Sequence, residues 1–151
     1  MTGGTGKDNR GANQARAKAR RLALQALYQW DLSGTDLKLI EQQFRESEEF
    51  PGVDDEYFQE LLHQVPARLD VVEAGLAGAM QIPWAELDPV ERAVLRLASY
   101  ELQARPDIPY RVVINEAVNL AKKFGAEQAH KFVNGVLDQA ARHLRPHEQA
   151  K

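Results

Sequence analysis

The sequence predicts an all-α fold of six or seven helices arranged in two small bundles. Apolar residues recur at spacings of three and four along most of the 151 residues, and no segment alternates apolar and polar residues for long. Residues that favour helix starts and ends separate these periodic segments. A chain of this length buries one substantial core, so one helical domain is expected over 14–151, with lobes at about 14–81 and 82–145.

The first predicted helix begins near Ala15. The preceding residues 1–13 are rich in glycine and polar side chains, and they are expected to form a disordered arm. The helix ends at Gly34, and a shorter helix over about 37–44 follows, before an acidic loop around Pro51.

The middle of the chain contains one broken helical stripe and one clear helix start. The stripe runs over 57–76, and Pro66 is expected to kink or break it because proline lacks a backbone N–H. In the following DPVE motif, Asp88 suits the cap, Pro89 suits the first helical position, and Glu91 is placed to bond back to the cap.

Two further helices complete the prediction. One opens at Pro109 and is ended by Gly125, and the other runs from about Glu127 to the residue before Pro146. The β-branched segment 111–114 is the only strand-like one, and the helical spacing that continues beyond it outweighs it.

Charge is unevenly distributed along the chain. The formal net charge is −3, but residues 1–21 hold six basic side chains against one acidic, whereas residues 31–60 hold ten acidic against two basic. Such a protein offers one face to an anion and another to a basic partner. The absence of cysteine excludes disulfides and thiolate metal sites. No apolar run reaches the roughly 18 residues of a membrane span, so a cytoplasmic protein without membrane contact is expected.

The sequence predicts no enzyme, no catalytic residue, no cofactor and no metal site. The GGTGK stretch at 3–7 is too short for a phosphate-binding loop, and Asp8 follows where such a loop carries a hydroxyl residue. His147 lacks the second histidine of a zinc helix, and the other histidines are far apart in the sequence. Capping explains the carboxylates of Asp88 and Glu91 without catalysis.

A cationic group on the first helix is the first candidate binding site. Its members, Arg16, Lys18, Arg20 and Arg21, are spaced to form a continuous ridge. The alternative is a solvated helix start. Because cations at a helix N-terminus oppose the macrodipole, the pattern favours an anion-binding role.

The stretch KKFGAEQAHKFVNG, residues 122–135, is the second candidate. Phe124 lies at a helix break, and Phe132 lies beside the apolar stripe of the last helix, with lysines around both rings. Rings that stack bases and ammonium groups that neutralise phosphates are typical of surfaces that bind single-stranded nucleic acid. The alternative, with both rings in the core and the lysines on its rim, stays open.

Three motifs resemble one protein family. ARRLALQALYQWDLSG, DPVERAVLRLASYEL and IPYRVVINEAVNLAKKFGAEQAHKFVNGVLD are similar to segments of the bacterial transcription antitermination factor NusB, and the resemblance covers about residues 15–145. It implies two three-helix bundles. It also implies pairing with the ribosomal protein NusE, and joint binding to the single-stranded boxA element of nascent RNA. The resemblance further implies that this binding helps RNA polymerase to pass terminators in ribosomal RNA operons.

The resemblance also implies site residues. The implied RNA-binding residues are Arg16, Lys18, Arg20, Arg21, Lys123, Phe124, Gly125, Lys131 and Phe132, and the implied NusE-facing residues are Tyr28, Glu91 and Tyr110. Another hypothesis is a helical protein-interaction module, or a homodimer, that does not bind RNA.

Overall fold

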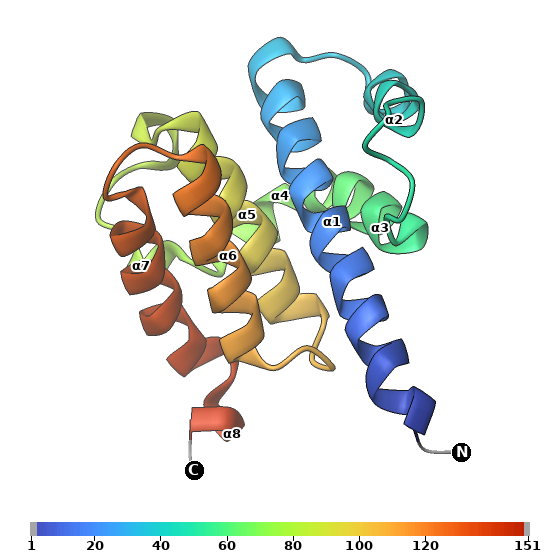
Figure 1. The fold of residues 1–151 in the computed structure, drawn as a ribbon. Helices are drawn as coiled ribbons and strands as arrows, with labels where there is room; N and C mark the ends of the chain where they lie inside the picture. The colour runs from blue at the N-terminus through green and yellow to red at the C-terminus, as the bar shows by residue number, and fades with distance from the viewer. Residues whose placement is uncertain (1–2, 150–151) are drawn as a thin grey trace. The chain divides into compact units, whose positions relative to one another are not determined.

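The computed structural model describes residues 3–149, and they form eight α-helices and two short 3₁₀ helices (Figure 1). The elements are α1 (Gly3–Ser33), α2 (Leu37–Arg45), α3 (Asp55–Ala67), α4 (Leu69–Ala74), η1 (Ala77–Ala79), η2 (Trp84–Glu86), α5 (Pro89–Ala104), α6 (Tyr110–Phe124), α7 (Ala129–Leu144) and α8 (Pro146–Gln149). These residues contain no strand, so the predicted all-α class is confirmed. The short α4 and α8 account for the larger helix number.

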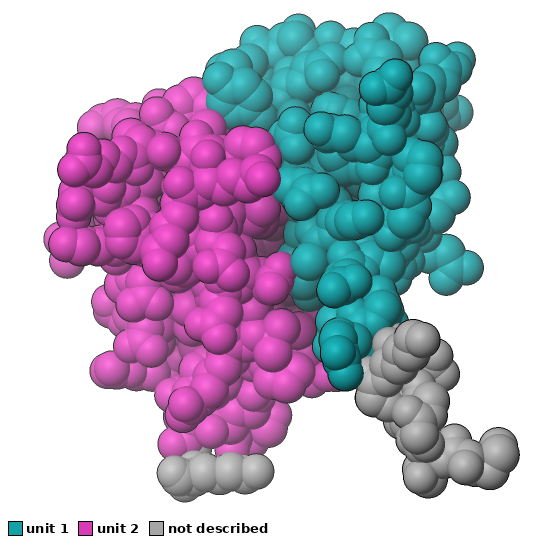
Figure 2. All heavy atoms as spheres, in the orientation of Figure 1, with its two compact units in different colours: residues 1–64 teal, residues 65–151 magenta. Residues whose placement is uncertain are grey.

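The chain divides into two compact units, residues 1–64 and 65–151 (Figure 2). The sequence predicts this division near residue 82, and the structure places it earlier. The reason is that residues 65–81 pack within the second unit, where α4 contacts α5 and η1 contacts α7. The Ser99 hydroxyl on α5 donates to the Val72 carbonyl at 2.6 Å, which fixes α4 on α5.

In unit 1, α1 packs on α2 and is helical from Gly3. The structure therefore differs from the disordered arm expected over 1–13; Met1 and Thr2 lie outside the described residues. The side chains of residues 10–14 are exposed, and burial begins at Ala15. Disorder over 1–13 stays a prediction.

An aromatic cluster anchors the core of unit 1. The fully buried Phe58 ring of α3 lies 6.4 Å from that of Phe44 and 5.5 Å from that of Phe50, both edge to face. Such pairs add to the stabilisation from burial.

Pro66 lies in the last turn of α3, which ends at Ala67, and α4 begins only two residues later. The predicted break at this proline is therefore confirmed.

In unit 2, α5, α6 and α7 pack side by side (Figure 1). Every residue of α5 from Ala93 to Leu102 is buried. The predicted start of this helix is confirmed, since Asp88 Oδ1 accepts from the Val90 N–H at 2.9 Å and Pro89 occupies the first turn.

The buried Arg145 joins α7 to the link between α5 and α6. Its guanidinium donates to four backbone carbonyls, those of Glu101, Leu102, Arg105 and Ile108, at 2.8–3.2 Å, and it pairs with Glu148 of α8. These bonds join the last turn of α5 and the link that follows it to the end of α7. They therefore fix the position at which α6 begins.

Candidate nucleic-acid interface

The arginine-rich face of α1 is partly built into unit 1. Arg20 is only 4% exposed, and the other three predicted cations are half-buried. The guanidinium carbons of Arg16 and Arg20 lie 5.0 and 5.5 Å from the centroid of the Tyr57 ring. Cation–π contacts are stronger where the partners are desolvated. Arg20 therefore has a packing role that the sequence does not predict.

Lys18 lies against the loop that precedes α3. A Cβ atom added to Gly52 would lie 3.0 Å from Lys18 Nζ, and Gly52 itself adopts a left-handed backbone conformation with φ of 89°. The Asp54 N–H also donates to the Ala15 carbonyl at 3.0 Å. The four cations thus do not form the continuous solvent-facing ridge that their spacing predicts, because this loop lies against Lys18 and the Tyr57 ring lies against Arg16 and Arg20.

The argument from the helix macrodipole also fails for these cations. Since α1 begins at Gly3, Arg16 lies about three and a half turns inside the helix. The macrodipole acts mainly within the first and last turns. The expected mismatch between these charges and the helix end therefore does not exist in the structure.

The α6–α7 turn comprises residues 122–132, and α6 ends where the sequence predicts. α6 ends at Phe124, and Gly125 is its C-cap, with its N–H donating to the Ala121 carbonyl at 2.8 Å. Gly125 has φ of −89°, so a left-handed conformation is not the reason for glycine here. A Cβ atom would lie 2.7 Å from the Ala121 oxygen and 3.1 Å from the Ala129 Cβ. Glycine is needed because a side chain would collide with the backbone of the last turn of α6 and press on Ala129 of α7.

The start of α7 contains an unusual backbone conformation. Gln128, its N-cap, has φ of 75°, the only positive φ of a non-glycine residue among those described. Such a conformation costs on the order of 1 kcal/mol or more and persists where surrounding structure requires it. It reverses the chain within four residues, from Phe124 to Ala129.

Aromatic and cationic side chains lie together on this turn. Lys123 is exposed, and its Nζ lies 5.8 Å from the centroid of the half-buried Phe124 ring. Lys131 is exposed and Phe132 is half-buried at the start of α7, while Val133 is fully buried. The two rings are therefore neither core residues nor fully exposed. Both retain surface that a planar ligand could cover.

The predicted partner-facing residues lie in different units. Tyr28, in unit 1, is 37% exposed, and Leu32, one turn further along α1, is 54% exposed. In unit 2, burial and the nearby charge of Asp88 raise the pKa of Glu91. Among the residues described, no backbone N–H at the start of α5 donates a hydrogen bond to Glu91. The prediction that Glu91 bonds back to the cap is therefore wrong. Its carboxylate thus stays available to a partner.

Tyr110 lies at the opposite end of the α5–α6 pair from Glu91. Because the helices run antiparallel, about 20 Å separates the two positions. The Tyr110 N–H donates to Glu148 Oε2 at 3.0 Å. Burial raises the pKa of Glu148, but the bonds from Tyr110 and Arg145 lower it overall, so this carboxylate is charged at neutral pH. The sequence gives no signal for this clamp, whose members are far apart in the chain.

Two negative findings concern the described part of the chain. It contains no group of three or more His, Cys, Asp or Glu side chains placed to hold a metal ion. It also contains no helix with both the length and the apolar character needed to cross a membrane.

Comparisons with known proteins place the chain in a family. The structure defines a small, all-helical protein of two compact units with a cationic and aromatic surface turn. The model of the NusB family matches residues 17–142, and the chain belongs to the NusB family.

Relatives of known name are close in sequence. The chain is 51% identical over 143 residues to the transcription antitermination protein NusB of Pseudomonas entomophila (strain L48), covering 95% of this chain and 85% of that protein. It is 50% identical over 148 residues to the same-named protein of Alkalilimnicola ehrlichii, covering 87% and 83%.

Solved structures agree with this placement. A crystal structure of the antitermination factors NusB and NusE in complex with double-stranded RNA matches with a TM-score of 0.78 at 29% identity, covering 86% of this chain and 98% of that chain. NusB of T. maritima matches with a TM-score of 0.74 at 30% identity, covering 90% and 97%.

Proposed function

We propose that this protein is an RNA-binding transcription antitermination factor that acts with the ribosomal protein NusE on the boxA element of nascent RNA. Its membership of the NusB family carries this proposal, together with relatives named as transcription antitermination proteins. One solved relative is in complex with NusE and RNA. The α6–α7 turn supplies the matching chemistry within this chain.

We propose the α6–α7 turn as the main RNA contact. Lys123 and Lys131 are exposed, which suits them to neutralise phosphates, and Phe124 and Phe132 expose part of their rings for base stacking. Gly125 lets the chain reverse tightly between the two rings. On α1, Arg16, Lys18 and Arg21 retain some exposure and are proposed as additional phosphate contacts, with Arg20 acting through its packing on Tyr57.

We propose two residues for the contact with NusE. The ring of Tyr28 and the neighbouring Leu32 form an exposed apolar area on α1, and such side chains favour a protein interface. Glu91 offers a carboxylate without a hydrogen-bond donor from its own helix start, which suits a basic partner.

The test is an RNA titration at fixed salt with and without NusE. The net charge of −3 and the few exposed cations leave one subunit able to neutralise only a small number of phosphates. Binding to boxA RNA should therefore be weak for this protein alone and much tighter with NusE. Equal affinity in the two titrations would contradict the proposal.

Two controls sharpen this experiment. Partly exposed rings favour unstacked bases, so single-stranded boxA RNA should bind more tightly than the same sequence annealed to its complement. The mass in solution, measured in parallel, separates this function from the alternative of a homodimer that does not bind RNA.

A further inference from the structure

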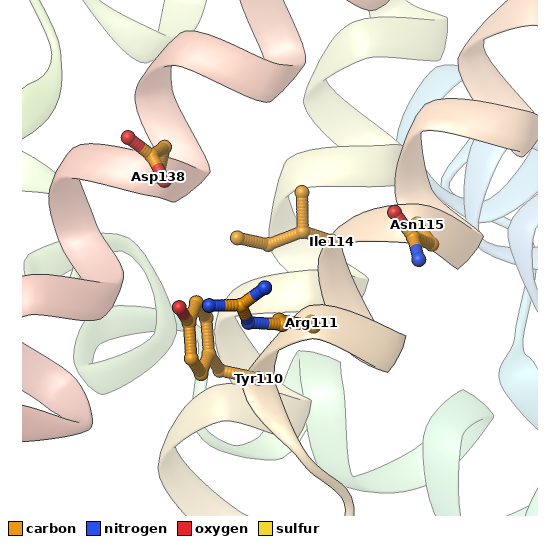
Figure 3. Close-up of a pocket in the computed structure, with 5 residues that line it drawn as sticks. All are labelled: Tyr110, Arg111, Ile114, Asn115 and Asp138. Atoms are coloured by element: carbon orange, nitrogen blue, oxygen red, sulfur yellow. The ribbon is translucent and has the colours of Figure 1, made fainter. Parts of the chain in front are cut away.

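A second polar site lies at the start of α6, about 20 Å along the helix from the α6–α7 turn. It is an open pocket of about 350 Å³ lined by Tyr110, Arg111, Ile114 and Asn115 of α6 and by Asp138 of α7. Figure 3 shows Arg111 beside the Tyr110 ring, Ile114 extending from α6 toward α7, and Asp138 on α7 across from them. This volume is near the lower end for ligand sites, so it suits one side chain or one nucleobase.

The lining groups combine recognition chemistry of several kinds. The Arg111 guanidinium lies 5.6 Å from the centroid of the Tyr110 ring, and no carboxylate of the described residues pairs with it. This cation is thus held in place and open to an anion. Asn115 both donates and accepts hydrogen bonds, Asp138 accepts them, and Ile114 provides an apolar floor. A planar base with a phosphate attached offers a matching set of groups.

The wall of the pocket is fixed by buried structure. Glu148 holds the Tyr110 N–H, and the buried Arg145 holds Glu148 in turn. A preformed wall reduces the ordering cost of binding.

The pocket is joined to the α6–α7 turn by one face of α6. Arg111, Asn115 and Lys122 are all exposed. Lys122 follows Arg111 by eleven positions, which is about three full turns, so both cations lie on the same side. They lie about 16 Å apart along the helix axis. A stacked strand carries one phosphate per roughly 3.4 Å, so this length corresponds to about five nucleotides.

We propose that this face of α6 is an RNA subsite, in which Arg111 and Lys122 contact phosphates of a single strand and the Tyr110 pocket holds one unstacked base. The subsite rests on the proposed function, because its ligand is a continuation of the same RNA. It assigns the Tyr110 ring to RNA instead of to NusE. Asp138, which also pairs with Arg142 at 3.5 Å, disfavours an anion inside the pocket, so the phosphates are placed at Arg111 and Lys122, and its carboxylate accepts from the amino group of a base.

The test combines RNA length with substitution. Single-stranded boxA RNA, and the same RNA extended by five nucleotides at either the 5′ or the 3′ end, are titrated in the presence of NusE. The protein variants are Arg111→Ala with Asn115→Ala, and the single Asn115→Asp. The control is Arg68→Ala, which removes an exposed cation of unit 2 outside this face and so changes the net charge as much as the double variant does. Both α6 positions are exposed, so thermal unfolding should be unchanged.

The extension at one end should tighten binding to the parent protein by about fivefold or more. The double variant should lose that gain. Its salt slope should fall by about 0.7 for the lost phosphate contact. Asn115→Asp should weaken binding of the same extended RNA, and Arg68→Ala should affect short and extended RNAs equally. A double variant that keeps the full gain would overturn the subsite.

Two other outcomes separate this inference from the proposed function. Weaker binding of NusE to the double variant without RNA would make the pocket a protein-docking site and overturn the inference alone. A parent that binds none of the RNAs, with or without NusE, would overturn the proposed function and this subsite with it.

Discussion

Two pairings of cations with aromatic rings, one in each unit, differ in whether the ring is accessible. In unit 1, Arg16 and Arg20 lie over the Tyr57 ring, which is 3% exposed. In unit 2, the exposed Lys123 lies over the half-buried Phe124 ring. The residue types are similar, but only an accessible ring can stack a base. The first pairing therefore supports the fold, and the second is suited to a ligand.

The largest expected effect follows from the buried ring. Tyr57→Ala should lower the free energy of unfolding by about 3–5 kcal/mol, because it removes a buried aromatic side chain. Urea unfolding measures this loss. Tyr57→Phe keeps the ring and should retain most of the stability. If Tyr57→Ala unfolded at the urea concentration of the parent, the Tyr57 ring would not support the fold as described.

The close approach at the α6–α7 turn gives the next effect. Gly125→Ala should cost about 1–3 kcal/mol, since the new methyl group would meet the Ala121 backbone oxygen. The control is Gly135→Ala in α7, where a Cβ meets nothing within 4 Å and should stabilise the helix by up to about 1 kcal/mol. Thermal unfolding of both variants checks the opposite signs, and equal shifts would contradict the account.

The half-buried Phe132 ring should affect RNA binding more than folding. Phe132→Ala should weaken RNA binding by about 1–3 kcal/mol through lost stacking, with a smaller loss of stability than Tyr57→Ala. Phe132→Leu is the matched control, because it keeps much of the apolar volume and loses the flat face. A large loss of stability, with unchanged affinity per folded molecule, would return Phe132 to the core.

Local signals explain what the sequence predicts correctly. The cap at Asp88 and the break at Pro66 depend on neighbouring residues, and both are confirmed. Gly125 ends α6 as predicted, but the reason for glycine is the space that the Ala121 carbonyl and Ala129 leave, which the local pattern does not indicate. The division between units depends on packing of α4 against α5, which no local pattern indicates.

Contacts between distant residues explain what the sequence does not predict. The burial of Arg20 depends on Tyr57, and the carbonyl partners of Arg145 lie 37 to 44 residues away. The sequence also gives no account of the Tyr110 pocket, although the spacing of Arg111 and Lys122 on one helix face was available as a signal.

The smallest effect separates neighbouring arginines of α1. Arg20→Ala should lower the free energy of unfolding by about 1–2 kcal/mol through the lost contact with Tyr57, whereas Arg21→Ala should change it by less than about 0.5 kcal/mol. Chemical unfolding of the two single variants decides this. Equal stability of both would mean that the whole face is simply solvated.

The salt dependence of RNA binding tests the role of the α6–α7 turn most directly. With NusE present, the double variant Lys123→Ala with Lys131→Ala should bind boxA RNA more weakly, and its log–log salt slope should be smaller by about 1.4 for two lost phosphate contacts. Its unfolding should match the parent, because both lysines are exposed. A double variant with the salt slope and affinity of the parent would show that RNA does not contact this turn.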